Sequence, residues 1–552
     1  MIKFSSVWAG GLLMAAATVF AEPSTATVEA QIVKDLHLHI AELADDSYAG
    51  REPGTAGEEK TIAWLEAAFT DLGTTPGNKG SWFQEVPITS VTSASSAVLA
   101  IRGPDFSADW AYGEEMMVAT QQQVAATGIS ASELVFVGYG INAPERGWND
   151  YAGIDVTGKT VVVLINDPGF ATQDPALFNG NAMTYYGRWD YKYAEAARQG
   201  AAGVLIVHET DAAAYPWEVV RNSWSGANIG LTADNGNRDK VAIEGWIPVQ
   251  QAEALFAASG RDYHASKRAA LDANFKAEPL QGFTASVQLQ NTLGSSLSRN
   301  VAALIPGSEH PEEVIIYTAH WDHLGVRPDD AGDNIYNGAS DNASGIAGLF
   351  ALARQFMQAE TAPARSILFL AVTAEESGLL GSKYYSENPI FAPAHTVANF
   401  NMDNIAAGNI GKTRDVAVVG FGNSELENYL AAAATAQGRT LVQEPYPEKG
   451  SYYRSDHFSL AKVGIPALYL TNATDSVEHG KAWGDARLKD YTANHYHKPS
   501  DEYDPAWDLS GAAQEVLLLL HMGSELAGNR DFPRWHQGVE FAPVREQSLN
   551  EK

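Results

Sequence analysis

The sequence predicts an α/β fold, a three-layer sandwich with a mixed central sheet, together with a separate β-rich domain. Apolar runs of strand length alternate with helical patterns through the second half of the chain, and several of these runs end abruptly in acidic residues. Residues 111–282 contain apolar strands of their own. A chain of 552 residues is also too long for one hydrophobic core, so at least two domains are expected.

The second half of the chain has the clearest alternation of strands and helices. Runs such as 367–372 (ILFLAV) are apolar at every position, which is typical of strands that are covered by helices on both faces of a sheet. Open α/β sheets bind their ligands at the carboxyl ends of such strands. The expected strands are 285–290, 300–305, 314–318, 367–372, 397–402 and 465–470, and the expected helices include 343–357 and 512–526.

The first half is predicted to contain two helices, a β-rich stretch and an inserted domain. Helical patterns cover 30–72 except for the Gly- and Pro-rich loop 46–57, and β-patterned sequence follows from 83 to 101. Inside 111–282, strand patterns cover 133–140, 159–165 and 201–207, and a helical pattern covers 191–200. The expected division is a signal peptide (1–21), the first part of the main domain (22–110), the inserted domain (111–282), the rest of the main domain (283–527) and a C-terminal tail (528–552).

The first 21 residues have the pattern of a secretory signal peptide. Lys3 supplies a positive charge, residues 7–20 are apolar, and Ala21 provides the small residue that precedes cleavage. The alternative is a transmembrane anchor, but the apolar run is short and rich in Gly and Ala. We therefore expect export to the periplasm or the extracellular space, without membrane attachment after cleavage.

The composition excludes some classes of function. A formal net charge of -30 disfavours binding to nucleic acid and to anionic membranes. The chain has no cysteine, so any bound metal ion would be held by His, Asp and Glu side chains alone.

Two adjacent acids, Glu375 and Glu376, follow the apolar strand 367–372. Taken alone, the pair could be the charged N-terminus of a helix, because the helix dipole favours acids there. At the carboxyl end of a strand, one glutamate can instead hold a metal ion while its neighbour transfers a proton. The residues by themselves do not say which glutamate does which.

Other element ends also carry side chains that bind metals. His320 and Asp322 follow the strand 314–318 and share a face as alternate residues of an extended chain, so Asp322 is well placed to hydrogen-bond the imidazole of His320. Asp341 lies just before the helix 343–357, where it is either a helix N-cap or a ligand.

The remaining candidates are Asp403, at the end of the strand 397–402, and His495 and His497 in a polar loop. Three carboxylates and two imidazoles exceed the four ligands of one tetrahedral zinc ion, but they suit two metal ions with one bridging carboxylate. The charges of two zinc ions, three carboxylates and one hydroxide also sum to zero. The resulting candidate set is His320, Asp341, Glu375/Glu376, Asp403 and His497.

The consecutive residues Ser455, Asp456 and His457 could suggest a Ser/His/Asp triad. Three consecutive residues in a short loop cannot form the hydrogen-bonded relay that a triad requires. We expect a structural or supporting role for them.

Six motifs in order complete this pattern. They are TAHWDHLG, NGASDNASG, TAEESGLLGS, NMDN, SDHFSLAKVGIPAL and YHKPSDEYD. Together they resemble the co-catalytic zinc aminopeptidase family, which includes aminopeptidase Y, bacterial leucyl aminopeptidases and glutamate carboxypeptidase. The resemblance covers about 285–525, and GREPGTAG adds an N-terminal part. FVGYGI, DYAGIDVTGKTVVVL and GAAGVLIV in the inserted domain resemble a protease-associated domain, with lower specificity.

The resemblance implies a role for each candidate. Asp341 would bridge two zinc ions, of which one is also held by His320 and Asp403 and the other by Glu376 and His497. Glu375 would be the general base, Asp322 would orient His320, and Tyr496 would hydrogen-bond the tetrahedral intermediate. The family also implies a cis peptide bond between Asp341 and Asn342.

The expected function is that of an exported zinc aminopeptidase acting on peptides. The nearest alternative is a carboxypeptidase of the glutamate-releasing type, which would need a cluster of Arg or Lys side chains to hold the substrate carboxylate. Arg454 is near the motifs, but the sequence shows no such cluster. A glutaminyl-cyclase-like transferase would use a single metal ion. A non-catalytic receptor-like module would lack ligands, whereas this chain has all five ligand positions and the base.

Overall fold

The structure is a computed structural model that describes residues 25–328 and 332–550. The predicted signal peptide, residues 1–21, lies outside the described residues. Within those ranges, none of the helices is both long and apolar enough to cross a bilayer.

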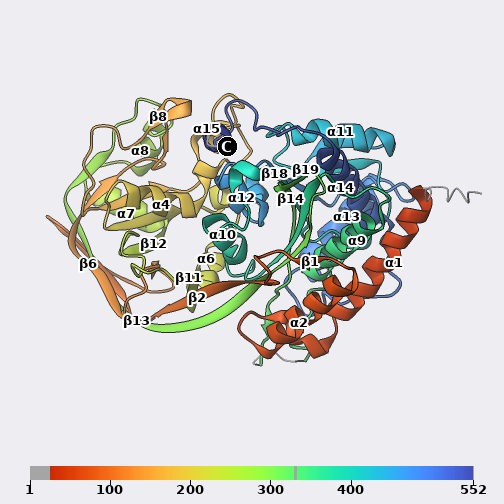
Figure 1. Ribbon diagram of the computed structural model, residues 1–552. Helices are drawn as coiled ribbons and strands as arrows, with labels where there is room; N and C mark the ends of the chain where they lie inside the picture. Colours follow the sequence, from red (N-terminus) through yellow and green to blue (C-terminus); the bar gives the residue numbers. More distant parts are fainter. Residues whose placement is uncertain (1–24, 329–331, 551–552) are drawn as a thin grey trace, which may run out of the picture.

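The main sheet is mixed and has parallel strands at its centre (Figure 1). β14 (His310–His320) pairs in parallel with both β17 (Arg365–Val372) and β18 (Thr396–Asn401). The sheet continues on either side through β13 (Glu278–Ile305), antiparallel to β17, and through β21 (Ala467–Thr471), β19 (Asp415–Val419) and β20 (Thr440–Gln443). The carboxyl ends of β14, β17 and β18 therefore lie at one edge, where ligands are expected.

Helices cover both faces of this sheet, which confirms the predicted sandwich (Figure 1). α1 (Thr25–Leu43), α9 (Ser344–Gln358) and α14 (Ser510–Gly528) pack on one face, and α10 (Leu380–Glu387) and α12 (His457–Lys462) pack on the other. Successive side chains of β17 alternate between the two helical layers. That alternation explains why this strand is apolar throughout.

The segment between β2 (Phe83–Ser93) and β13 builds a second sheet with its own core. β9 (Thr160–Leu164) pairs in parallel with β6 (Ala126–Phe136) and β10 (Gly203–His208), and β10 pairs in parallel with β12 (Ile243–Pro248). Two apolar clusters fill this part of the molecule. Leu99 and Leu289, on either side of 111–282, belong to the first of these clusters.

One long strand, β13, connects the two sheets and is green in Figure 1. The sequence predicted two strands here, 285–290 and 300–305, because the residues between them (291–299) are polar. In the structure residues 291–301 pair with β2 along its whole length, so backbone hydrogen bonding continues where burial does not. The strand is continuous because its backbone N–H and C=O groups form hydrogen bonds with the partner strand β2, even where its side chains are not packed in an apolar core.

The other elements complete the two sheets and their connections. The remaining strands are β1 (Thr75–Pro76), β3 (Val98–Gly103), β4 (Phe106–Ala111), β5 (Met117–Ala119), β7 (Asn142–Ala143), β8 (Trp148–Asn149), β11 (Ala227–Leu231), β15 (Gly325–Val326) and β16 (Ile335–Tyr336). The remaining α-helices are α2 (Ala56–Asp71), α3 (Pro168–Thr172), α4 (Trp189–Arg198), α5 (Thr210–Ala213), α6 (Trp217–Trp224), α7 (Val249–Ala258), α8 (Tyr263–Ala269), α11 (Leu426–Ala436), α13 (Lys481–Asn494) and α15 (Ala542–Asn550).

Candidate metal centre

Five separate segments bring the predicted ligands to the carboxyl edge of the main sheet. His320 is the last residue of β14, Glu376 follows β17, and Asp403 follows β18. Asp341 lies in the turn that opens α9, and His497 lies in the loop after α13. Because three of these strands are parallel neighbours, their ends place the side chains within reach of one another.

Three of the side chains form one half of the site. The Nε2 atom of His320 lies 3.2 Å from Asp341 Oδ1 and 3.3 Å from Asp403 Oδ1. The imidazole of His320 is 1% exposed, so these donors face one another inside the protein. An imidazole and two carboxylate oxygens converging in this way can hold a metal ion.

The other half of the site uses the second oxygen of Asp341. His497 Nε2 lies 3.3 Å from Asp341 Oδ2 and 3.1 Å from Glu376 Oε2. Asp341 thus presents Oδ1 to one histidine–carboxylate pair and Oδ2 to another. A carboxylate in that position has the geometry of a bridge between two metal ions.

His323 is a member of the site that the sequence reasoning did not assign. Its Nδ1 atom lies 2.8 Å from Glu376 Oε1, and His323, Asp341 and Glu376 form a second group that could hold a metal ion. The sequence signal was present, since His323 follows Asp322 in the first motif. Burial favours protonation of Glu376, but His323 and His497 oppose it and lower the pKa of this carboxyl to about 2.

The donor set fits zinc. It consists of imidazole nitrogens and carboxylate oxygens, which are the zinc ligands open to a chain without cysteine. His323 Nδ1 and Glu376 Oε1 face each other at 2.8 Å, and His323 Nε2 is buried without a hydrogen-bond partner among the described residues. Burying a polar atom without a hydrogen-bond partner costs folding free energy, unless a bound ion interacts with that atom.

Glu375 occupies a different environment from its neighbour. Its backbone N–H donates to Asp322 Oδ1 at 3.1 Å, and the N–H of Glu376 donates to Asp322 Oδ2 at 3.4 Å. Burial raises the pKa of the Glu375 carboxyl well above its usual range, and the charges of Asp403 and Glu376 add to that rise. A carboxyl with a raised pKa next to a metal centre is suited to accept and hold a proton.

Asp322 supports the site in two ways. The carbonyl oxygen of Asp322 lies 3.1 Å from His320 Nδ1, whereas its carboxylate is 3.8 Å away. The backbone of Asp322 therefore orients the imidazole, and its carboxylate holds the backbone of the glutamate pair. The sequence reasoning had attributed the first of these roles to the side chain.

Tyr496 stacks on the last ligand. Its ring lies 3.9 Å from that of His497, at an interplanar angle of 24°. Burial raises the pKa of the Tyr496 phenol well above its usual value, so the hydroxyl stays protonated and can donate a hydrogen bond.

The turn that carries Asp341 is fixed from outside the ligand set. The carboxylate of Asp501 accepts the backbone N–H groups of Ser340 and Asp341, at 3.1 and 3.0 Å. The peptide bond between Asp341 and Asn342 is cis, as the resemblance implied. Asp501 lies in the last of the six motifs, but only the structure shows that it holds this turn.

Ser455 takes part in a chain of buried hydrogen bonds rather than in a catalytic triad. Its hydroxyl donates to Asp403 Oδ2 at 2.6 Å and accepts from Asn401 Nδ2 at 2.7 Å. Thr318 in turn donates to Asn401 Oδ1 at 2.7 Å. The chain occupies Oδ2 of Asp403 and leaves Oδ1 directed toward His320.

We expect Ser455→Ala to weaken zinc binding about tenfold, because outer hydrogen-bond partners of ligands typically contribute about 10–100-fold to metal affinity. Without its hydrogen bond, Asp403 is free to rotate away from His320. The measurement is zinc affinity by competition with a chelator. Ser366→Ala is the control. Ser366 is also buried, but it lies at the start of β17, whereas the metal centre lies beyond the carboxyl end of that strand. Equal losses in the two variants would contradict the assigned role.

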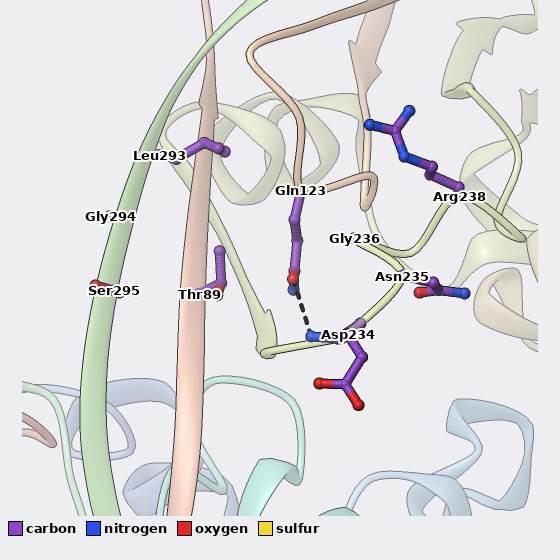
Figure 2. A pocket seen from close by; sticks show the side chains of 10 residues that line it. Thr89, Gln123, Asp234, Asn235, Gly236, Arg238, Leu293, Gly294 and Ser295 are labelled. Carbon is purple, nitrogen blue, oxygen red and sulfur yellow. Dashed lines mark hydrogen bonds between the residues drawn. The ribbon is translucent and has the colours of Figure 1, made fainter.

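One open cavity lies apart from the metal centre. Figure 2 shows an open cavity of about 470 Å³ between the β2/β13 ribbon and the loop 233–238. Gln123 crosses it and accepts the backbone N–H of Ala233 through Oε1 at 3.0 Å. None of its lining residues belongs to the metal centre, so we do not place the chemistry there.

Comparison with known proteins places this centre in a family. Residues 300–521 match the sequence profile of peptidase family M28. This segment is an M28 peptidase domain. The matched residues include every candidate ligand from His320 to His497, and the resemblance to co-catalytic zinc aminopeptidases is thereby confirmed. The protease-associated nature of the inserted domain stays a prediction.

Individual relatives of the M28 domain differ in the reaction that their names state. The chain is 25% identical over 415 residues to a glutamate carboxypeptidase 2 homolog of Caenorhabditis elegans, covering 65% of this chain and 50% of that protein. It is 28% identical over 213 residues to a probable leucine aminopeptidase 2 of Aspergillus oryzae, covering 37% of this chain and 39% of that protein. The chain thus spans half or less of these relatives. A solved aminopeptidase from Aneurinibacillus sp. strain AM-1 is 23% identical, with 91% of this chain and 97% of that chain covered and a TM-score of 0.48.

Proposed function

We propose that this chain is an exported aminopeptidase that binds two zinc ions and removes residues from the amino terminus of peptides. The observation that carries the proposal is the position of Asp341, whose two carboxylate oxygens face two separate histidine–carboxylate pairs. A single-metal transferase would not need this arrangement. A non-catalytic relative would not need Glu375 beside it.

The residues divide between two metal positions and one proton acceptor. His320, Asp403 and Asp341 Oδ1 would hold one zinc ion, and Glu376, His497 and Asp341 Oδ2 would hold the other. Bound zinc would supply Lewis acidity, which lowers the pKa of a water and polarises the scissile carbonyl. Glu375 accepts the proton of the attacking water and passes it to the departing amine. The Tyr496 hydroxyl donates to the oxygen on which negative charge develops.

Charge favours an amino-terminal substrate. The centre is surrounded by buried carboxyl groups, including Asp456 and Asp501 in addition to the ligands, and such a site attracts a protonated α-amine. The probable leucine aminopeptidase 2 among the relatives supports the same reading. These two observations bear on which end of the peptide is bound. They do not indicate which amino-terminal side chain the site prefers.

A carboxypeptidase of the glutamate-releasing type is the second candidate. It is favoured by the name of the Caenorhabditis elegans relative and by Arg454, an exposed cation whose charge acts on Tyr496. An arginine in that position could hold the carboxylate of a substrate.

A substrate panel separates the two. We expect the purified chain to hydrolyse aminoacyl anilides with free amines, to lose this activity with a chelator, and to regain it when zinc is added. N-acetylation of the same anilides should abolish cleavage, because it removes the positive charge. Cleavage of N-acylated acidic dipeptides in preference to the anilides would overturn the proposal in favour of the carboxypeptidase.

Export is part of the proposal and has a separate basis. It is supported by the sequence pattern of residues 1–21. Amino-terminal sequencing of protein secreted by an expression host tests it, with cleavage expected after Ala21.

A further inference from the structure

Arg51 is a buried cation directly behind the metal centre. It lies in the GREPGTAG loop between α1 and α2, and it is 1% exposed. The sequence predicted this loop as a break between helices and as an N-terminal part of the family resemblance, without a role for Arg51. A cation that is withheld from solvent in this way requires a structural or electrostatic reason, because burying a charge is costly.

The guanidinium of Arg51 joins three segments of the chain. Nε donates to the carbonyl of Trp321 at 2.9 Å, and Nη2 donates to the carbonyl of Gly338 at 2.9 Å. Nη1 donates to the carbonyls of Asn337 and Leu43, both at 2.6 Å. The planar fork of an arginine presents five N–H donors on three nitrogens at fixed angles, whereas a lysine presents three donors on a single nitrogen.

Two of these segments carry metal ligands. Trp321 stands between His320 and Asp322, and Gly338 stands three residues before Asp341. A rigid connection between their backbones therefore fixes the separation of His320 from the bridging Asp341. The third segment, the end of α1, anchors this connection to the helical layer.

The charge of Arg51 also acts on the acids of the centre. Burial lowers the pKa of its guanidinium to about 10, and Asp322, Asp501, Asp341 and Glu376 oppose that shift. Arg51 is thus cationic at neutral pH. All its described hydrogen bonds go to carbonyl oxygens, so its positive charge is shared among several carboxylates instead of being paired with one.

The backbone of the loop that carries Arg51 has an unusual conformation. Ala49, Gly50 and Arg51 have φ values of 48°, 62° and 52°, in the left-handed region that residues with side chains usually avoid. A Cβ atom on Gly50 would lie 2.5 Å from the carbonyl oxygen of Gly325, so glycine is needed where the loop meets β15. A left-handed backbone at residues with side chains costs free energy, so it persists only where contacts with the surrounding structure hold it in place.

We propose that Arg51 is a positioning residue of the metal centre, which holds the His320 and Asp341 segments at the separation that the zinc ion shared by these two ligands needs, and which supplies a positive charge to the surrounding carboxylates. The inference rests on the proposed two-metal site. It does not depend on which peptide bond is cleaved.

The chain provides a matched control in Arg545. This arginine is 0% exposed and donates to the carbonyls of Pro393 and Thr396 at 3.1 and 3.0 Å, and burial likewise lowers its pKa to about 10. Its acceptors lie at or just before the start of β18, whereas Asp403 follows the end of that strand. Replacing Arg545 therefore removes a buried arginine of the same kind whose contacts lie at the end of β18 that is remote from Asp403.

The test compares Arg51→Met, Arg51→Lys and Arg545→Met in the full chain, by zinc stoichiometry, zinc affinity in chelator competition, and melting temperature with and without zinc. We expect Arg51→Met to lose about 10–100-fold in zinc affinity, the range typical of groups that orient metal ligands. Arg51→Lys should recover part of that loss, since it restores the charge but not the fork. Arg545→Met should lower the melting temperature and leave zinc affinity unchanged.

The outcomes are separable. Zinc affinity that falls equally in Arg51→Met and Arg545→Met would overturn the inference, because the effect would then be one of general stability. Should Arg51→Met fail to fold, Arg51→Lys decides, and wild-type zinc affinity in that variant would overturn the inference. A wild-type chain that binds two zinc ions but cleaves no peptide contradicts the proposed function and leaves this test intact.

Discussion

Replacing Glu375 by glutamine is expected to abolish peptide hydrolysis while the chain keeps its full zinc content. Positioned general bases contribute about 10²–10⁴-fold to rate, and glutamine cannot accept the proton of the attacking water. The side chain of Glu375 belongs to neither group of metal-binding side chains, so its loss leaves the ligand set complete. The measurements are kcat on an aminoacyl anilide and zinc per chain by elemental analysis.

The neighbouring glutamate provides the comparison. Glu376 lies 3.1 Å from His497 and 2.8 Å from His323, so Glu376→Ala is expected to lose zinc as well as activity. The two variants differ by one position in the chain and remove the same type of charge. Equal zinc loss in both would refute the division of roles between these residues.

The second large effect is expected at Asp341. Asp341→Ala should lose both zinc ions and all measurable hydrolysis, because Oδ1 and Oδ2 serve the two halves of the centre. His497→Ala, which touches one half, should retain one zinc ion. Elemental analysis after dialysis against zinc-free buffer measures the difference.

Asp150→Asn is the control for removing a buried aspartate. Asp150 is 2% exposed and accepts hydrogen bonds from Ile141 and Trp148 inside the inserted segment, remote in sequence from every ligand. It should lower stability without changing the zinc content. One zinc ion retained by Asp341→Ala would show that Asp341 serves a single metal.

The α/β architecture was predictable because a strand that is buried on both faces needs apolar side chains at consecutive positions, and this pattern is visible in the sequence. β17 is apolar at consecutive positions since helices cover both of its faces, and the pattern therefore marks a central strand. The continuity of β13 was not predictable, because its middle section is held by pairing with β2 and has no apolar periodicity. Hydrogen bonding between backbones places no requirement on side-chain type.

The identity of the candidate ligands followed from their positions at the ends of elements. Acids and histidines that directly follow buried strands have few structural explanations, and several together indicate a shared site. His323 and Ser455 were adjacent to such positions but received no defined role. Their contributions depend on which atom they face: Nδ1 toward Glu376 Oε1 in one case, and a hydroxyl toward Asp403 Oδ2 in the other.

The sequence by itself determined the types of ligand, the strand ends that carry them and the excess of acids over cations, because these depend on local pattern and composition. Only the tertiary structure decided how the two oxygens of Asp341 are divided, and that Arg51 lies behind them. Such assignments depend on the relative placement of segments nearly 300 residues apart, from Arg51 to Trp321 and Gly338. That placement is set by packing and by backbone hydrogen bonds across the whole domain, which no short stretch of sequence contains.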